Sequence, residues 1–202
     1  MMIPWTRQAI ALALLTLAAS VQAAPHATRD LRLSTDGDGA LREISICARP
    51  SPDALKNLPG HLFVAYSILQ QGGQRLYLAV GHTTSAAPKD ALMTYFGTHT
   101  VRGSLSEELY THSQEECLVL QVNEGDFGAA YQLTQPFLPP GSYSPDPRQW
   151  RPTLLAYSLG GNDCMEFAIG VARVFERKGL VVPQRGATEL PLTYVRRLID
   201  AN

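Results

Sequence analysis

The sequence has few charged residues and no excess of either sign. Its 202 residues include 17 lysines and arginines against 18 aspartates and glutamates, which gives a formal net charge of −1. The basic residues form no stripe or patch, and such clustering is the usual electrostatic footprint of a nucleic-acid-binding protein. We therefore expect no nucleic-acid partner.

Metal- and cofactor-binding motifs are missing as well. Neither CxxC nor HExxH occurs in the chain, although zinc sites commonly contain such paired ligands. Residues 36–39 read DGDG, like the start of a calcium loop, but Cys47 stands where an EF-hand requires glutamate. We interpret DGDG as a turn and expect no metal and no cofactor. A zinc site built from Cys164, His61 and His82 is a minor alternative.

Long apolar segments occur only at the N-terminus, since no later stretch is apolar enough to span a membrane. Residues 1–23 follow the order of a secretory signal peptide: Arg7, an apolar core, then the small-residue site VQA. A retained membrane anchor is the alternative. We expect cleavage after Ala23, export to the bacterial periplasm or beyond, and no stable membrane insertion afterwards. The rest is expected to be a flexible lead-in over residues 24–40 and a single domain over residues 41–202.

Only three cysteines are present, and their odd number leaves one thiol over if the others pair. Export implies an oxidising compartment, in which paired cysteines form disulfides. Cys47 in EISICA and Cys117 in ECLVLQV lie in strand-like segments, whereas Cys164 begins a helix-like one. We predict a Cys47–Cys117 disulfide and a free Cys164, with two buried core thiols as the alternative.

The hydrophobic periodicity predicts an α+β fold, a small antiparallel sheet packed against helices. The expected strands cover residues 41–48, 61–69, 75–82 and 117–122, with a hairpin turn at residues 71–73. We expect a capped short helix or turn over residues 51–58 and one helix over residues 104–110. Further helices are expected over residues 124–134, from Cys164 and from Pro191. The proline-rich residues 136–152 are interpreted as a surface loop that carries Trp150.

The helix that begins at Cys164 is amphipathic. Its apolar stripe consists of Cys164, Phe167, Ala168, Val171 and Phe175. Asn162 or Asp163 is positioned to cap the helix start. There the free N–H groups and the helix dipole favour the thiolate, which is the nucleophilic form of cysteine. A buried core cysteine is the alternative.

No histidine follows Cys164, so any catalytic base must come from earlier in the chain. Of the five histidines, only His61 and His82 lie on apolar strands, and the hairpin register places His61 opposite His82 or its neighbour. AYSLG resembles a nucleophile elbow around Ser158, but that fold requires a histidine downstream of the serine. The residues therefore favour a Cys-His hydrolase.

The stretch YSLGGNDCMEF, residues 157–167, resembles the cysteine motif of NlpC-type papain-like cell-wall peptidases, in which a tyrosine and Gly-Gly precede Asp-Cys. Met165 and Glu166 replace the usual Ser-Gly, and the histidine that should follow is missing. Both departures fit the circularly permuted branch of this superfamily, which includes lecithin:retinol acyltransferase-like proteins with an early Gly-His strand and a late Asn-Cys helix. PGHLFVAYS and NDCMEFA match that order, and the likeness covers roughly residues 59–183.

The resemblance implies a permuted papain-like arrangement in which Cys164 is the nucleophile and His61 the general base. His82 would be the third polar residue, which orients the imidazole. The residues expected near the oxyanion or the substrate are Tyr157, Asn162 and Trp150.

The function that the resemblance implies is hydrolysis by an exported cysteine peptidase or amidase. It would cleave an amide bond, in the stem peptides of peptidoglycan, through an acyl-enzyme intermediate. The alternatives are an acyltransferase or lipid-ester hydrolase that uses the same dyad, and a non-catalytic envelope-binding protein.

Overall fold

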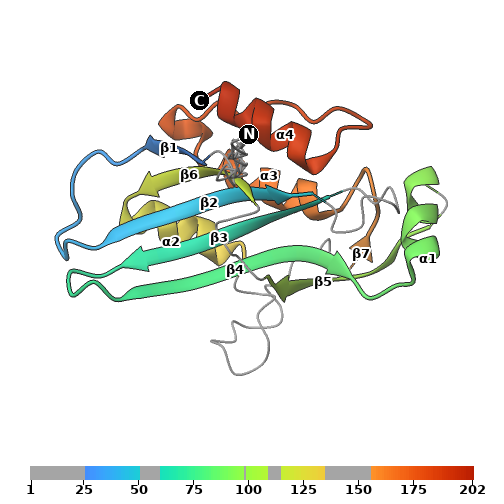
Figure 1. Ribbon diagram of the computed structural model, residues 1–202, viewed down its shortest axis with the longest axis horizontal. Coiled ribbons are helices and arrows are strands. Elements are labelled where there is room, and N and C mark those ends of the chain that lie inside the picture. The colour runs from blue at the N-terminus through green and yellow to red at the C-terminus, as the bar shows by residue number, and fades with distance from the viewer. Residues whose placement is uncertain (1–25, 51–59, 98, 109–114, 135–155) are drawn as a thin grey trace, which may run out of the picture.

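The computed structural model describes residues 26–50, 60–97, 99–108, 115–134 and 156–202. They form an α+β fold, a seven-stranded, mostly antiparallel sheet with four helices packed on it (Figure 1). The α+β prediction is confirmed. The signal peptide expected over residues 1–23, the helix expected at 51–58 and the loop that carries Trp150 lie outside the described residues.

The strands follow the spatial order β1-β6-β2-β3-β4-β5-β7. Only β1 and β6 pair in parallel. The strands are β1 (His26–Asp30), β2 (Leu41–Arg49), β3 (His61–Leu69), β4 (Arg75–Thr84), β5 (Val101–Glu107), β6 (Glu116–Val122) and β7 (Ala156–Tyr157). The helices are α1 (Pro88–Met93), α2 (Glu124–Gln132), α3 (Cys164–Arg173) and α4 (Pro191–Asp200), with short 3-10 helices η2 (Thr94–Phe96) and η6 (Glu176–Lys178).

The β3–β4 hairpin has the register that its short turn predicts. Leu69 pairs with Arg75, and the ladder continues as far as Val64 and Val80. Beyond that pair the two strands no longer pair with each other. The first residues of β3 and the last residues of β4 therefore lie at one end of these two neighbouring strands, and this is where the candidate site lies.

Helices α2, α3 and α4 pack against one face of the sheet, and α1 lies at its end beside β7 (Figure 1). Alternate residues of each central strand point to that face, as the two-residue period of a strand requires. The main core contains Ile44, Ile46, Leu62, Val64, Leu118 and Leu120 from the sheet and Ala168, Ile169, Val195 and Leu198 from the helices. A smaller cluster on the other face contains Cys47, Phe63, Ala65, Ala79 and Cys117.

Cys47 and Cys117 form a disulfide, as predicted. They are direct partners across β2 and β6, with their Cα atoms 4.2 Å apart, and both are fully buried. The third cysteine, Cys164, is free and buried. The disulfide therefore joins two central strands behind the sheet face that the helices cover.

The lead-in expected as flexible over residues 24–40 contributes a strand instead. β1 pairs in parallel with β6 over its whole length of five residues. After it, the DGDG stretch forms the expected turn, in which the Gly39 N–H donates to the Asp36 carbonyl at 2.9 Å. Local composition missed the strand because its partner, β6, lies about ninety residues further along the chain.

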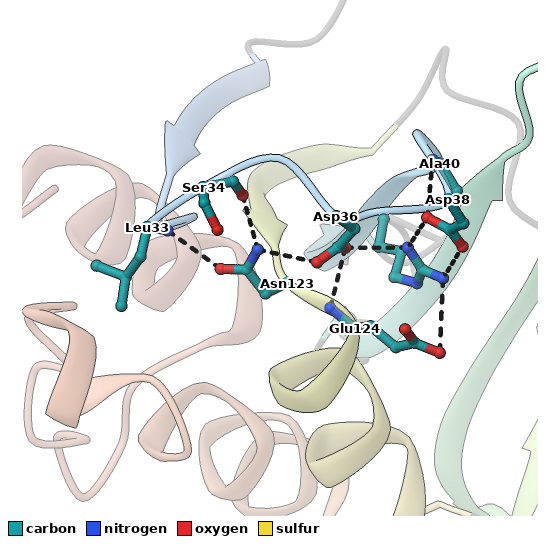
Figure 2. Close-up of polar contacts among 8 residues, drawn as sticks. Leu33, Ser34, Asp36, Asp38, Ala40, Asn123 and Glu124 are labelled. Atoms are coloured by element: carbon teal, nitrogen blue, oxygen red, sulfur yellow. Dashed lines mark hydrogen bonds and ion pairs between the residues drawn. The ribbon is translucent and has the colours of Figure 1, made fainter.

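The carboxylates of the DGDG turn bind protein groups, as Figure 2 shows. Asp36 accepts hydrogen bonds from the Asn123 side chain at 3.0 Å and from the Glu124 N–H at 3.1 Å. Arg42, which is buried, donates to both Asp36 and Asp38. These bonds attach the turn to the start of α2 and use the oxygens that a calcium ion would need.

The helix expected over residues 104–110 is wrong for the residues that the structure describes, because Val101–Glu107 is strand β5. Gly103 and Leu105 face the interior while their neighbours are more exposed, which is the two-residue period of a strand. β5 pairs with β4 on one side and β7 on the other. This long-range pairing overrides the local helix propensity of the segment.

We predict that replacing both Cys47 and Cys117 by alanine lowers the free energy of unfolding. The disulfide closes a 70-residue separation, and the chain-entropy model assigns such a loop about 4 kcal/mol. Urea unfolding of the oxidised wild type and the double variant measures the difference. Reduced wild type should resemble the double variant, and equal stability of all three would contradict the prediction.

Candidate active site

Cys164 is the first residue of α3, and the residue is only 5% exposed. Asp163 caps the helix, since its carboxylate accepts hydrogen bonds from Met165 N at 3.0 Å and Glu166 N at 3.2 Å. None of the hydrogen bonds recorded among the described residues uses the N–H of Cys164. The helix start therefore holds the thiol in place and leaves one backbone donor beside it.

The turn before the helix is shaped by Asn162. Its side-chain amide donates to the Ala156 carbonyl at 2.7 Å, and its backbone pairs with Ser158. Gly160 has a φ of 79°, a left-handed conformation that favours glycine. The Gly160-Gly161-Asn162 sequence thus reverses the chain between β7 and α3. Asn162, which was expected near the oxyanion or the substrate, stabilises this turn through its hydrogen bond to Ala156.

His61 begins β3, and its ring lies between two polar partners. Its Nε2 is 3.0 Å from Oε1 of Glu108. Burial alone would lower the pKa of His61, but hydrogen bonds with the Cys164 thiol and the Glu108 carboxylate outweigh it and raise the pKa to about 9. The structure therefore brings His61 and Cys164 together, with the imidazole favoured in its charged form at neutral pH.

Glu108 follows β5 and forms an ion pair with Arg49 on its other side. Burial tends to raise the pKa of Glu108, but His61 and Arg49 together hold it below its usual value. The Arg49 guanidinium also lies 5.0 Å over the ring of Phe63. Neither charged residue stands out in the sequence, because Glu108 lies in the segment interpreted as a helix and Arg49 belongs to no motif.

Gly81 on β4 makes room for the contact between His61 and Glu108. A Cβ atom at Gly81 would lie 2.3 Å from His61 Nε2 and 2.8 Å from Glu108 Oε1. Both distances are far shorter than a van der Waals contact. Any other residue at this position would displace one of the two side chains.

His82 is fully buried and pairs with Leu105 of β5. Its ring packs edge-on against Tyr157, with ring centroids 5.3 Å apart. The carboxylate that hydrogen-bonds the His61 ring belongs to Glu108, whereas His82 supports Tyr157. Burial, together with negative charge at Cys164 and Asp163, raises the pKa of Tyr157 above its usual value, so its hydroxyl keeps its proton.

Arg185 reaches the helix start from the segment that follows α3. It donates two hydrogen bonds of 2.8 Å to the two carboxylate oxygens of Asp163. Burial alone would lower the pKa of Arg185, but Asp163 and then Cys164 raise it. Asp163 also accepts the N–H of Gly160 at 2.9 Å. Arg185 therefore fixes Asp163, which caps α3 next to Cys164 and also binds the turn at Gly160. No sequence motif pointed to this arginine.

A cavity of about 410 Å³ opens at the thiol. Its volume lies within the range of small-molecule sites, roughly 300–1,000 Å³. Its lining includes His61, Tyr157, Asp163, Cys164 and Met165. The other lining residues include Leu92, Tyr95, Leu159, Gly160, Arg185, Ala187, Thr188, Glu189, Leu190 and Pro191. Trp150, expected near the substrate, lies outside the described residues.

Among the described residues, no group of three or more histidine, cysteine, aspartate or glutamate side chains is arranged to hold a metal ion. No helix in the described ranges is long and apolar enough to cross a membrane. No protein-family model matches the chain. The curated proteins include no match, and neither do the solved structures.

We predict that Gly81→Ala slows alkylation of Cys164. The added methyl group would overlap the His61 ring and separate it from Glu108, so the ring would no longer keep its place beside the Cys164 thiol. Iodoacetamide labelling near pH 7, followed by mass spectrometry, should slow roughly tenfold. Gly72→Ala is the matched control, because a Cβ there meets nothing within 4 Å. Equal labelling rates in the two variants would show that Gly81 does not protect the contact.

We predict that Glu108→Gln lowers the pKa of His61 from about 9. Glutamine has the same shape but no negative charge, so it stabilises the imidazolium less. Nuclear magnetic resonance titration of the His61 ring measures the shift. Glu107→Gln, one residue earlier at the end of β5, is the control and should leave the titration unchanged. A His61 ring that titrates at the same pH in the Glu108 variant would refute the assignment.

Proposed function

We propose that the protein is a cysteine hydrolase that acts on an amide or ester carbonyl through an acyl-enzyme. Cys164 is the nucleophile, His61 the general acid and base, and Glu108 the residue that orients the imidazole. The observation that carries the proposal is the His61 ring, which lines one cavity together with Cys164 and whose Nε2 lies 3.0 Å from the Glu108 carboxylate. A nucleophile, a base and an orienting group in this order are the signature of covalent acyl transfer.

In the proposed first step, the Cys164 sulfur forms a bond to the carbonyl carbon, and the carbonyl electrons move to its oxygen. The N–H of Cys164 at the start of α3 is positioned to donate to this oxyanion, and the hydroxyl of Tyr157 lies in the same cavity. When the intermediate collapses, the His61 imidazolium gives its proton to the leaving nitrogen or oxygen. The products are a thioester on Cys164 and a free amine or alcohol.

In the second step, neutral His61 takes a proton from water as the water oxygen attacks the thioester carbonyl. Collapse of this intermediate breaks the C–S bond, and the acyl group leaves as a carboxylic acid. Cys164 and His61 return to their starting protonation states. If an alcohol or amine replaces the water, the same residues perform acyl transfer.

The permuted papain-like arrangement is part of the proposal. The order along the chain supports it, because the histidine strand β3 precedes the cysteine helix α3 and both pack together. The disulfide supports an exported protein, since such bonds persist in oxidising compartments. The candidate substrate that follows from the resemblance is an amide bond in the stem peptides of peptidoglycan.

We predict that Cys164→Ala and His61→Ala each abolish nearly all hydrolysis of p-nitrophenyl acetate. Loss of a general base costs about 10²–10⁴-fold, and the double variant should lose little more, because residues that act as a unit are non-additive. His99→Ala, which changes a histidine outside the Cys164 cavity, is the control and should keep its activity. The wild type should also show an acyl adduct on Cys164 by mass spectrometry.

Wild-type hydrolysis that survives Cys164→Ala, or a folded wild type that forms no adduct, would show that the site is not catalytic. That result would leave a non-catalytic binding protein. Digestion of purified peptidoglycan with the same variants tests the candidate substrate separately.

A further inference from the structure

A second cavity lies on the sheet face opposite to the described helices, the face that carries the smaller core cluster. Its lining includes Thr28, Glu43, Ser45, Ser67, Arg75 and Tyr77. We call this cavity the outer groove, and its volume of about 430 Å³ lies in the range of small-molecule sites, roughly 300–1,000 Å³. Among the described residues, the outer groove and the Cys164 cavity share no lining residue.

The register of the sheet accounts for a hollow at this place. One row of cross-strand partners consists of short side chains, namely Thr28, Val119, Ser45, Ala65 and Ala79. The next row on the same face includes the longer side chains of Gln121, Glu43 and Tyr77. The row on the other side contains the Cys47–Cys117 disulfide and Phe63. Since alternate residues of a strand share one face, the short row lies between two taller rows.

Ser45, in the short row, is a buried polar residue at the outer groove. It is only 5% exposed, and no other described residue hydrogen-bonds its hydroxyl. Proteins rarely bury a hydroxyl without a hydrogen-bond partner, because such burial is unfavourable. A molecule with hydrogen-bonding groups in the groove is placed to be that partner.

Arg75 and Glu43 form a charge pair in the outer groove. Arg75 Nη1 donates to Glu43 Oε2 at 2.8 Å and also to the Ser67 hydroxyl. The other Glu43 oxygen accepts from the Gln121 amide at 3.5 Å. A guanidinium has five N–H donors, and those on Nε and Nη2 of Arg75 bind no other described residue. The pair therefore adds no net charge to the groove but leaves N–H donors available beside it.

These features together favour a neutral ligand that carries hydroxyl groups. An ionic ligand would have to compete with the partner that Arg75 or Glu43 already has, whereas a hydroxyl can donate to the carboxylate and accept from the guanidinium. Tyr77 is 42% exposed at the groove, and its ring offers an apolar surface next to these polar groups. Saccharides combine hydroxyls with apolar C–H faces in the same way.

We propose that the outer groove binds a neutral saccharide, whose hydroxyls bond Ser45 and Arg75 while one face of the sugar ring packs against Tyr77. The site is a binding site that goes beyond the proposed hydrolase. It does not depend on Cys164, since the two cavities are lined by different described residues. The protein would thus hold a glycan whether or not it turns over a substrate.

Nuclear magnetic resonance titration of the folded, ¹⁵N-labelled protein tests the proposal. The neutral probes are cellobiose, maltose, chitobiose and methyl glucoside. Glucuronate and glucosamine carry a negative and a positive charge on the same ring as methyl glucoside. At least one neutral disaccharide should shift the amide signals of Ser45, Ser67 and Tyr77, with a Kd on the order of 1 mM. Methyl glucoside should bind at least about threefold more tightly than either charged sugar.

Ser45→Ala should weaken binding of the neutral disaccharide by about three- to tenfold, because one hydrogen bond is lost. The same change should leave Tm unchanged or raised, since it removes a buried hydroxyl that binds no described residue. Tyr77→Ala should weaken binding by at least about threefold. Leu76→Ala is the matched control, because Leu76 is 45% exposed on the same strand but lies on the other face of the sheet. It should bind the disaccharide like the wild type.

Absence of shifts at the groove amides with all four neutral probes would overturn the proposal and leave a groove that holds water. Tighter binding of glucuronate or glucosamine, or unchanged affinity in both Ser45→Ala and Tyr77→Ala, would overturn it as well. Cys164→Ala should bind the disaccharide as the wild type does. Loss of hydrolysis with retained saccharide binding therefore counts against the hydrolase alone, and the reverse result counts against the outer groove alone.

Discussion

The position of the His61 imidazole between a thiol and a carboxylate is the constraint on which the rest of the site depends. Burial opposes a charge on the ring, yet hydrogen bonds with Cys164 and Glu108 raise its pKa to about 9. Those bonds need three separate parts of the chain: the start of β3, the residue after β5 and the start of α3. The sheet supplies this meeting point because β3 and β4 stop pairing before His61, and because Gly81 leaves the space that a side chain would fill.

The thiol side of the site is fixed by a different set of forces. Asp163 caps α3, accepts the Gly160 N–H and binds Arg185 through both carboxylate oxygens. A buried carboxylate is unfavourable without such partners, and an ion pair of this kind is strongly destabilised when either member is removed. The cap therefore cannot shift without losing several bonds at once. This rigidity keeps Cys164 at the cavity that His61 also lines, as the proposed mechanism requires.

Much of the fold and half of the site follow from local pattern. The strand periods, the hairpin register and the disulfide are all visible in short segments, and exclusion of the other histidines leaves His61 as the candidate partner of Cys164. Glu108 could not be found in this way, because its segment has the composition of a helix and becomes a strand only by pairing with β4. Arg185 escaped for a related reason, since its role depends on a contact 22 residues away in sequence. β1 likewise depends on a partner strand that local sequence does not reveal.

The disulfide constrains the histidine side of the site more directly than the thiol side. The loop that it closes contains His61, Gly81 and Glu108 but not Cys164, so its constraint acts on the histidine and the carboxylate beside it. Cys47 pairs with Phe63 across β2 and β3, and the Phe63 ring stacks near His61 with centroids 6.3 Å apart. Cys164 is held instead by the packing of α3 on the sheet and by the Asp163 cap. Formation of the Cys47–Cys117 disulfide is therefore expected to order His61 and Glu108. The reactivity of the Cys164 thiol then depends on whether His61 lies beside it.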